Sequence, residues 1–253
     1  MAISSTWSDY IRNPKISSNN KLKIFDAASR SVLFYGAQIW GCKRYEDVEK
    51  LLRFFIKKLF SLPQNTPNYM IHIETGLSSQ FVQTLQIHFN YILKVTCLSD
   101  NRLPKILASE IIAKNISWAK DWENICNETE IDLSRLADLS LQEKFSHIID
   151  AVKTHEMSIN IQYAKSSQFH DSYSLLDFNV SPLLLYGYDS KATGLLIKAR
   201  GGLLDINARA FKNNTFGICT ICNLDMAENT FHFIGVCPIY KRIRFTHFNK
   251  HTL

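Results

Sequence analysis

The chain has 253 residues, of which 46% are hydrophobic and 21% are charged. These values are typical of a protein with a buried core and exclude a disordered chain, and the length allows one large domain or a medium domain with a small appended module. The formal net charge of +6 favours a polyanionic partner without requiring one. Residues 1–15 lack the apolar segment of a secretory signal, and no run of about 18 apolar residues predicts a membrane helix. We therefore expect a soluble, non-secreted protein of the cytoplasm or nucleus without a membrane partner.

Helical periodicity fills the first part of the chain. A loose leader rich in serine and asparagine covers residues 1–20, and apolar residues at three- and four-residue steps then predict one helix over residues 21–41. Its apolar face comprises Phe25, Ala28, Val32, Tyr35 and Ile39. Residues 48–60 fit the template of an amphipathic helix throughout, and Pro63 ends this segment. We expect both helices to bury their apolar faces.

The polar face of residues 48–60 is basic. Helical spacing brings at least three of its cations to one side of the helix. These cations are Lys50, Arg53, Lys57 and Lys58. The face is either a solvated surface or a ridge that contacts phosphates, and the sequence leaves both interpretations open. In the prediction of a nucleic-acid interface we include Lys50, Arg53 and Lys57 as a second, weaker patch.

Further helices complete the predicted body. They are expected over residues 78–95, about 104–126 and about 134–155. Ser78 or Ser79 can cap the first of them, and His88 lies on its apolar stripe, where a core role is favoured over ligand binding. Because sustained strand alternation and internal repeats are absent from the sequence, the predicted fold class is mainly α, with a helical body over residues 21–165.

A change of composition follows the helical body. Residues 166–190 are rich in serine, aspartate and asparagine and include Pro182, which predicts a linker and a domain boundary. Residues 191–245 then form a second unit, in which a short basic helix with Lys198 and Arg200 precedes a compact cysteine-rich module. Residues 246–253 are expected to be a frayed tail.

The six cysteines divide into two groups. Cys42, Cys97 and Cys126 stand alone among apolar residues, as free buried cysteines do. The other three join one histidine in the pattern Cys-x2-Cys-x9-His-x4-Cys, formed by Cys219, Cys222, His232 and Cys237. Four such ligands at this spacing suit a tetrahedral zinc ion, and a fully filled ligand set indicates a structural site rather than a catalytic one.

Basic and aromatic residues surround these four ligands. Lys198 and Arg200 precede the module, and three cations follow its last ligand: Lys241, Arg242 and Arg244. The nearby aromatic residues are Phe216, Phe231, Phe233 and Tyr240. Such a mixture can neutralise phosphates and stack on unpaired bases, although at least two of the aromatics are needed for the core of so small a module. We therefore predict RNA or DNA as the partner.

Separate parts of the chain resemble the C-terminal region of LINE-type, or non-LTR (jockey-like), retrotransposon reverse transcriptases. Three pieces of this sequence are similar to the CCHC zinc knuckle of these polymerases: Cys-x2-Cys-Asn-Leu from residue 219, Glu-Asn-Thr-Phe-His-Phe over residues 228–233 and Cys-Pro-Ile-Tyr over residues 237–240. The basic stretch before that knuckle resembles residues 196–202. The polymerase thumb resembles Tyr-Gly-Ala-Gln-Ile-Trp-Gly over residues 35–41 and Leu-Pro at residues 62–63. The resemblance implies a helical thumb-like body joined to a zinc knuckle that binds nucleic acid.

The resemblance does not extend to the catalytic centre of these polymerases. Their palm carries aspartates, including a Tyr-x-Asp-Asp turn that holds two metal ions, whereas this sequence contains no Asp-Asp pair. The run Tyr-Gly-Tyr-Asp-Ser over residues 186–190 offers a single carboxylate. We thus expect a nucleic-acid-binding C-terminal fragment of an RNA-directed DNA polymerase that grips template RNA or target DNA without catalysing synthesis. One alternative is a truncated or co-opted remnant whose knuckle binds a protein partner, and another is a catalytic subunit, which the missing carboxylates disfavour.

Overall fold

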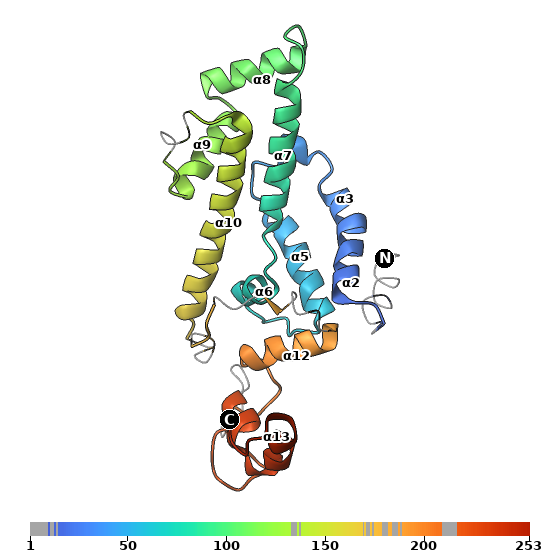
Figure 1. The fold of residues 1–253 in the computed structure, drawn as a ribbon, viewed down its shortest axis with the longest axis vertical. Coiled ribbons are helices and arrows are strands. Elements are labelled where there is room, and N and C mark those ends of the chain that lie inside the picture. The colour runs from blue at the N-terminus through green and yellow to red at the C-terminus, as the bar shows by residue number, and fades with distance from the viewer. Residues whose placement is uncertain are drawn as a thin grey trace.

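The structure, a computed structural model, is an elongated helical body with a small module at its C-terminal end (Figure 1). It describes residues 10, 13, 15–132, 136, 138–168, 170, 173, 175–178, 182–183, 187, 189–208 and 217–253. The mainly α fold class is confirmed, because the described residues contain no β-strand, although an isolated antiparallel bridge joins Ile218 to Ala227. None of the helices in these ranges is both long enough and apolar enough to cross a bilayer. Most of the expected leader, including residues 1–9, lies outside the described residues.

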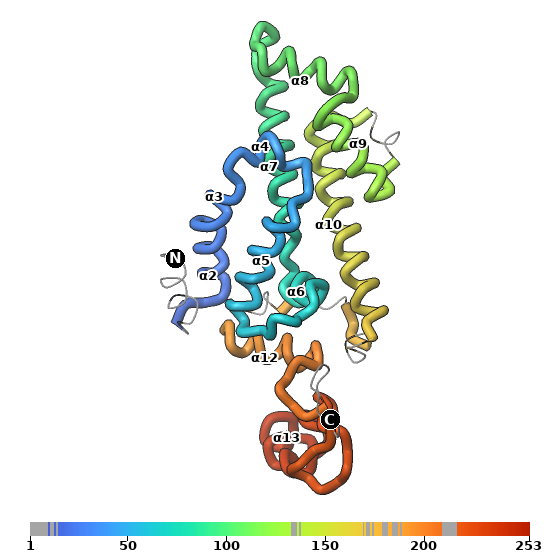
Figure 2. The backbone as a smooth tube through the Cα atoms, turned by 180° about the vertical axis from the view of Figure 1, so that it is seen from behind, coloured from blue at the N-terminus to red at the C-terminus, as the bar shows by residue number. Residues whose placement is uncertain are grey.

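The helices of the body follow one another in chain order. They are α2 (Ser18–Phe25), the π-helical turn η1 (Asp26–Arg30), α3 (Ser31–Leu33), α4 (Ala37–Trp40), α5 (Glu46–Leu59), α6 (Asn68–Thr75), α7 (Gln80–Thr96), α8 (Leu103–Lys114), α9 (Trp118–Glu128), α10 (Leu141–Lys165) and α12 (Ser190–Arg200). The module contains the π-helical turn η4 (His232–Val236), the 3-10 turn η5 (Pro238–Tyr240) and α13 (Lys241–Phe248). As Figure 1 and Figure 2 show, α7 and α10 run along the body, α8 lies at one end, and α12 crosses the other end next to the module.

The prediction of a single helix over residues 21–41 is wrong. The chain instead forms α2, one π-helical turn and α3, and a left-handed glycine (φ 74°) then separates α3 from α4. A π turn adds a residue to the turn, so apolar positions spaced for an α-helix no longer share one face. Phe25 is buried as expected, whereas Val32, Tyr35 and Ile39 are 76%, 88% and 73% exposed. This part of the chain therefore presents apolar side chains to its surface.

The amphipathic pattern of residues 48–60 correctly predicts α5. This helix buries the apolar stripe that the pattern identifies: Leu52, Phe55, Ile56 and Leu59. The helix α2 packs against this stripe, and the rings of Phe25 and Phe55 stack with their centroids 4.3 Å apart. Ser79 caps α7, as expected, because its hydroxyl oxygen accepts a hydrogen bond from the Val82 amide (3.3 Å).

The other predicted helices differ from the structure in their limits. The segment 104–126 divides into α8 and α9, because Asn115 adopts a left-handed backbone (φ 48°) that ends α8. The expected helix over residues 134–155 corresponds to α10, although residue 134 itself lies outside the described residues. α10 begins at Leu141, where Ser140 and Glu143 form a reciprocal capping box, and it continues well beyond residue 155.

The helix α12 packs against the body, although the predicted linker and boundary would separate the two. Gly194 approaches the end of α5 so closely that a Cβ atom there would lie 2.1 Å from the Phe60 carbonyl oxygen. Any larger residue at this position would push the two segments apart. Ile197, one turn later, is completely buried in the core that α2 and α5 share. The close approach thus makes α12 part of the helical body.

A buried ion pair fixes the end of α12 on α6. The Glu74 carboxylate is 2% exposed and accepts hydrogen bonds from Arg200 Nε (2.8 Å) and from the Tyr173 hydroxyl (2.9 Å). Burial and the neighbouring Glu74 raise the pKa of Tyr173, so its hydroxyl keeps the proton that it donates. Removing Arg200 would leave the buried Glu74 carboxylate without its positive partner, so Arg200 has a structural role although its own side chain is 28% exposed. Tyr173 is buried although it belongs to the predicted linker.

An aromatic cluster holds α7, α9 and α10 together. Phe89 and Phe145 stack with ring centroids 4.0 Å apart, and Trp122 meets both rings edge-on. His88 is buried in this cluster, as expected: its Nε2 accepts from the Trp122 indole N–H (3.0 Å), so Nδ1 carries the proton and donates to the Gln38 carbonyl oxygen (2.8 Å). Burial lowers the pKa of His88, and the imidazole is neutral in the folded protein.

The buried neutral His88 predicts a loss of stability in weak acid. In the unfolded chain this imidazole has a pKa of about 6.5, so below that pH the unfolded state takes up a proton that the folded state does not. The stabilising contribution is therefore complete above about pH 6.5 and falls below it by up to about 1.4 kcal/mol per pH unit. The free energy of unfolding, measured with urea at about pH 7 and about pH 5, should fall less for His88→Gln than for the parent.

Glutamine is a suitable replacement because its amide keeps an acceptor for the Trp122 indole and a donor for the Gln38 carbonyl, yet does not titrate. The remaining titratable groups are common to both proteins, so their contributions to the pH dependence cancel in the comparison. An equal loss of stability in the parent and in His88→Gln would contradict a neutral, buried His88.

Candidate metal centre

Four metal-ligating side chains converge in the C-terminal module. The ligand atoms of Cys219, Cys222, His232 and Cys237 all lie within 4.8 Å of one another, and all four residues are buried. Cys222 Sγ is 3.4 Å from His232 Nε2. Tetrahedral thiolate and imidazole ligands, each about 2.0–2.3 Å from one ion, would be separated by roughly 3.5 Å, so this arrangement can hold a metal ion. The cluster predicted from the sequence pattern is confirmed as a candidate metal centre.

A tight turn presents the first two ligands. The backbone pairs Ile218 with Ala227 as an antiparallel bridge, and the Cys219 amide donates to the Met226 carbonyl oxygen (2.9 Å). Within the turn, Asn223 adopts a left-handed backbone (φ 52°), which asparagine tolerates better than most residues. The chain reverses direction over a few residues, and the Cys-x2-Cys spacing places both thiols on the inner side of the reversal.

Hydrogen bonds inside this turn prepare the thiols for a metal ion. Burial by itself raises the pKa of Cys219, but donors that include the amides of Ile221 and Cys222 outweigh it, so the pKa of this thiol is lowered. The pKa of Cys222 is raised instead, first by burial and further by negative charge on Cys219 and Cys237. Thiolates that are close together disfavour one another, and a divalent cation between them removes this conflict.

One π-helical turn presents the other two ligands. In η4 the Cys237 amide donates to the His232 carbonyl oxygen (2.8 Å), which is the five-residue hydrogen bond of a π turn. This turn brings both side chains to the same side and explains why the spacing His-x4-Cys fits one ion. Asn229 fixes the start of the turn, since its Oδ1 accepts from the His232 amide (2.7 Å). Nε2 of His232 faces the thiols, so Nε2 is the ring nitrogen that would bind a metal ion.

Arg244 lies in the interior of the module, which corrects its assignment to a nucleic-acid surface. The residue is 3% exposed. Its guanidinium donates to three carbonyl oxygens, those of Cys237 (2.6 Å), His251 (2.8 Å) and Ile234 (3.4 Å). These bonds tie the backbone of the last ligand to η4 and to residues 246–253. The expected frayed tail is therefore part of the module, and the donors of Arg244 are committed to it.

The other cations predicted around the module differ in their availability. Lys241 and Arg242 are exposed at the start of α13, and no ion pair joins either of them to another described residue. Lys198 is half-buried on α12. Arg200 is committed to the buried Glu74 carboxylate, which corrects its assignment as a phosphate contact. Of the cations predicted around the module, Lys241 and Arg242 thus remain exposed and without an ion pair to a described residue.

The second predicted patch, on α5, is largely neutralised by its own surroundings. Lys50 pairs with Asp47 (2.9 Å) and Arg53 pairs with Glu46, both within the same helix. Lys57 donates to a backbone carbonyl oxygen (2.6 Å), and burial lowers its pKa. Of the two interpretations that the sequence left open, these contacts favour a solvated polar face over a phosphate-contacting ridge.

The aromatic side chains of the module fall into two groups. Phe233 and Tyr240 meet edge to face with ring centroids 4.9 Å apart and form a small core, as expected for two of them. Phe231 is 64% exposed. Sequence reasoning missed Phe245 and Phe248, which are about half exposed on α13. Their three-residue spacing in a basic helix was a signal, but part of that helix was assigned to a frayed tail.

Other sequence expectations have mixed outcomes. Cys42 and Cys126 are buried as expected, and burial raises the pKa of each thiol to about 11, so both stay protonated. Cys97 is exposed, contrary to the expectation of a buried side chain, because it follows the last turn of α7. Phe216 lies outside the described residues.

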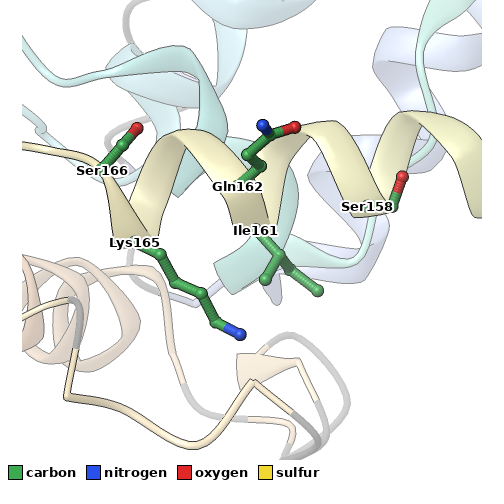
Figure 3. Close-up of a pocket in the computed structure, with 5 residues that line it drawn as sticks. All are labelled: Ser158, Ile161, Gln162, Lys165 and Ser166. Carbon is green, nitrogen blue, oxygen red and sulfur yellow. The ribbon is translucent and has the colours of Figure 1, made fainter.

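A hollow of about 450 Å³ lies along the C-terminal end of α10. Its lining residues are Ser158, Ile161, Gln162, Lys165 and Ser166. Figure 3 shows Ile161 and Lys165 on one side of the helix and Gln162 on the other. The side chains do not converge on one point, and a single charged group cannot supply an acid–base pair. We assign no function to this hollow.

The metal centre predicts one bound ion per chain. Replacing Cys219 and Cys222 together by serine should abolish binding, because two of the four ligands are lost. Cys97→Ser is the matched control, since it removes an exposed cysteine outside the centre and should leave the metal content unchanged. Elemental analysis of the purified, dialysed proteins measures the metal content of each.

Removal of the ion by a chelator should unfold the module and leave the body folded. Metal binding in small modules contributes on the order of 10–16 kcal/mol, whereas the body has cores of its own. Hydrogen exchange should therefore increase over residues 217–248 and stay slow in α7 and α10. Retention of the ion by the double serine variant would contradict the assignment of the ligands.

A comparison of the chain with protein-family models, with curated proteins and with solved structures gives no match. The arguments for function therefore come from the chain itself. They rest on a mainly helical body and on four buried metal-ligating side chains near the C-terminus.

Proposed function

We propose that the chain is a zinc-dependent nucleic-acid-binding part of a non-LTR retrotransposon RNA-directed DNA polymerase and has no catalytic centre of its own. In this role it holds template RNA or target DNA in the cytoplasm or nucleus. The observation that carries the proposal is a buried four-ligand metal centre with two unpaired, exposed cations directly after its last ligand. A rigid centre of this kind keeps positive charge at a fixed surface, which is what recognition of a phosphate backbone requires.

Zinc is the ion that this ligand set suits best. Three thiols and one imidazole are soft or borderline ligands, and their arrangement fits tetrahedral coordination. Magnesium and calcium, which prefer oxygen ligands, are disfavoured. Since the protein supplies all four ligands, the ion would have no open position for substrate, and its role would be structural.

The proposed nucleic-acid surface lies on α13 and on Phe231, which directly precedes η4, and η4 itself contacts α13. Lys241 and Arg242 can neutralise phosphates. Exposed Phe231 and Phe248 offer aromatic faces on which unpaired bases can stack, each worth about 1–3 kcal/mol where such stacking occurs. One face of the Phe245 ring is already covered by His251, with ring centroids 4.8 Å apart. Arg200 and Arg244 are left out of this surface because their guanidinium groups serve buried acceptors. Lys198, half-buried on α12, stays a predicted contact.

An exposed apolar surface supports the origin of the chain from a larger protein. Val32, Tyr35 and Ile39 are each more than 70% exposed, on the segment whose sequence resembles a polymerase thumb. Several large apolar side chains that face solvent together usually mark a surface that another protein part covers. We propose that the polymerase body covers this one.

A second candidate function is protein binding through the same module. On the turn between the second and third ligands, Leu224 and Met226 are 52% and 44% exposed, and Ile221 beside them is 46% exposed. Apolar side chains at the tip of a rigid turn suit a protein partner better than a phosphate backbone. The salt dependence of binding separates the two functions, because phosphate contacts release counterions and apolar contacts do not.

Nucleic-acid binding should depend on salt through Lys241 and Arg242. Each phosphate contact adds roughly one unit to the slope of log affinity against log salt, so replacing both residues by alanine should flatten the slope by about two. Fluorescence anisotropy with single-stranded RNA and with duplex DNA, over a series of salt concentrations, measures this slope. The variant Lys114→Ala with Lys153→Ala is the matched control, because it removes the same charge from lysines that pair with carboxylates on the body.

The expected result requires that the double variant keep its metal ion, which elemental analysis verifies on the same sample. If the variant lacking Lys241 and Arg242 has its full metal content and binds with unchanged affinity and slope, the nucleic-acid surface is assigned wrongly. The protein-binding function would then take its place.

The chain should not extend a primer. Its sequence contains no Asp-Asp pair, and within the described part of the chain the side chains able to hold a metal gather at the Cys/His centre, which includes no carboxylate. Two-metal nucleotidyl transfer needs carboxylate ligands. Incorporation of labelled nucleotide on an RNA template with magnesium or manganese should therefore equal that of a control without protein. Synthesis that follows the chain through successive purification steps would overturn this part of the proposal.

A further inference from the structure

Glu228 is a buried carboxylate beside the metal centre and outside its ligand set. The residue is 7% exposed. One carboxylate oxygen, Oε2, accepts a hydrogen bond from the backbone N–H of Asn207 (2.9 Å). The other, Oε1, lies 3.9 Å from Cys219 Sγ. Its backbone is also committed, because its amide donates to the Gly217 carbonyl oxygen (2.7 Å) and its carbonyl oxygen accepts from the Ala208 amide (3.2 Å). Glu228 thus touches both the first ligand and the segment that leads into the module.

The segment over residues 201–208 is fixed at both of its ends. Towards the module, Asn207 Nδ2 donates to the Ile218 carbonyl oxygen (3.1 Å), next to the first ligand. Towards the body, Leu203 is 2% exposed and packs in the core that contains Met70 and Tyr173. A short, partly buried connection therefore runs from the core of the helical body towards the metal centre, and Glu228 binds its last residues.

We propose that Glu228 is a positioning residue of the metal centre: it holds the Asn207 backbone beside the turn that carries Cys219 and so couples metal binding to the docking of residues 201–208 on the module. This inference depends on the metal centre and not on the nucleic-acid surface. Where that surface functions as proposed, the coupling fixes its placement relative to α12. Without Glu228, the module would still hold four ligand residues but would lose the acceptor that holds Asn207 next to the first of them.

The physical case rests on what a buried carboxylate costs. A buried carboxyl group is unfavourable unless it makes hydrogen bonds, so its hydrogen-bond partners indicate its role. Here Oε2 accepts a hydrogen bond from the backbone N–H of Asn207. A buried amide left without an acceptor costs about 1–3 kcal/mol. In metal sites, groups that orient the ligands commonly change metal affinity by about 10–100-fold when they are removed.

The first test measures metal affinity in three proteins. Competition between the chain and a chromophoric chelator for zinc(II), and separately for cobalt(II), gives the dissociation constants of the parent, Glu228→Ala and Glu228→Gln. We expect alanine to weaken binding by about 10–100-fold. Glutamine should stay within about threefold of the parent, because its amide oxygen can still accept from Asn207 and its amide group can donate to a thiolate. Asp150→Ala, which removes an exposed carboxylate on α10, is the control and should bind like the parent.

The second test measures the coupling directly. Hydrogen exchange in the presence and absence of zinc should show that metal binding slows exchange over residues 201–208 in the parent. In Glu228→Ala this effect should be lost even at zinc concentrations that saturate the site. Asn207→Ala provides an independent variant, since it removes the bond to Ile218 without touching a ligand, and it should reduce the same protection while the module stays folded.

The outcomes separate this proposal from the metal assignment. Parent affinity in Glu228→Ala, or an equal loss in Glu228→Gln and Glu228→Ala, would overturn the positioning role, because hydrogen bonding by the side chain would not be what matters. Metal-independent exchange over residues 201–208 in the parent would overturn the coupling. A parent chain that binds neither zinc nor cobalt would overturn both the metal centre and this proposal.

Discussion

The buried interior of the C-terminal module is made of its own metal ligands. Its one cluster of buried apolar residues in the described part of the chain consists of Cys219, Cys222 and Cys237, with Tyr240 packed against them. A unit of this size cannot bury enough apolar surface to fold by hydrophobic burial, and small domains of this kind usually need a metal or disulfides. Without an ion, three thiol side chains would form only a small apolar core, and as thiolates they would repel one another. The position of every other residue in the module, including Arg244, therefore depends on four side chains meeting at one point.

The helix α12 connects the metal centre to the rest of the molecule. Gly194 allows α12 to lie against the end of α5, and the Glu74–Arg200 ion pair holds its other end on α6. Residues 201–208 then continue as a short, partly buried connection to the turn that carries Cys219. A linker of flexible residues would allow the module to sample many orientations. Here both ends of the connection are hydrogen-bonded or buried, so the body and the module are mechanically joined.

The sequence predicts those elements whose signal is local and strong. α5 has a complete amphipathic pattern, Ser79 is a capping residue before an apolar stripe, and the metal ligands have a specific spacing. Failures arise where a tertiary contact overrides a local pattern. The π-helical turn before α3 shifts the register of the predicted apolar face, and nothing in its sequence marks that turn. In the sequence, Arg200 cannot be told from a basic surface residue. Its partner Glu74 is far away in the chain, and only the packing of α12 on α6 brings the two together.

Arg242 and Arg244 show why the positive charge of this chain overstates its surface for polyanions. They are two residues apart on α13, yet Arg242 faces solvent, while Arg244 donates to carbonyl oxygens inside the module. With Arg200 and the α5 cations also engaged, the proposed interface depends on the exposed Lys241 and Arg242. Proteins that bind nucleic acid strongly through the backbone commonly neutralise about 6–10 phosphates, so a module with two such contacts would hold its ligand weakly by itself. In the proposed role, firm retention would require further contacts from another protein part, for which the exposed apolar residues Val32, Tyr35 and Ile39 are the proposed contact.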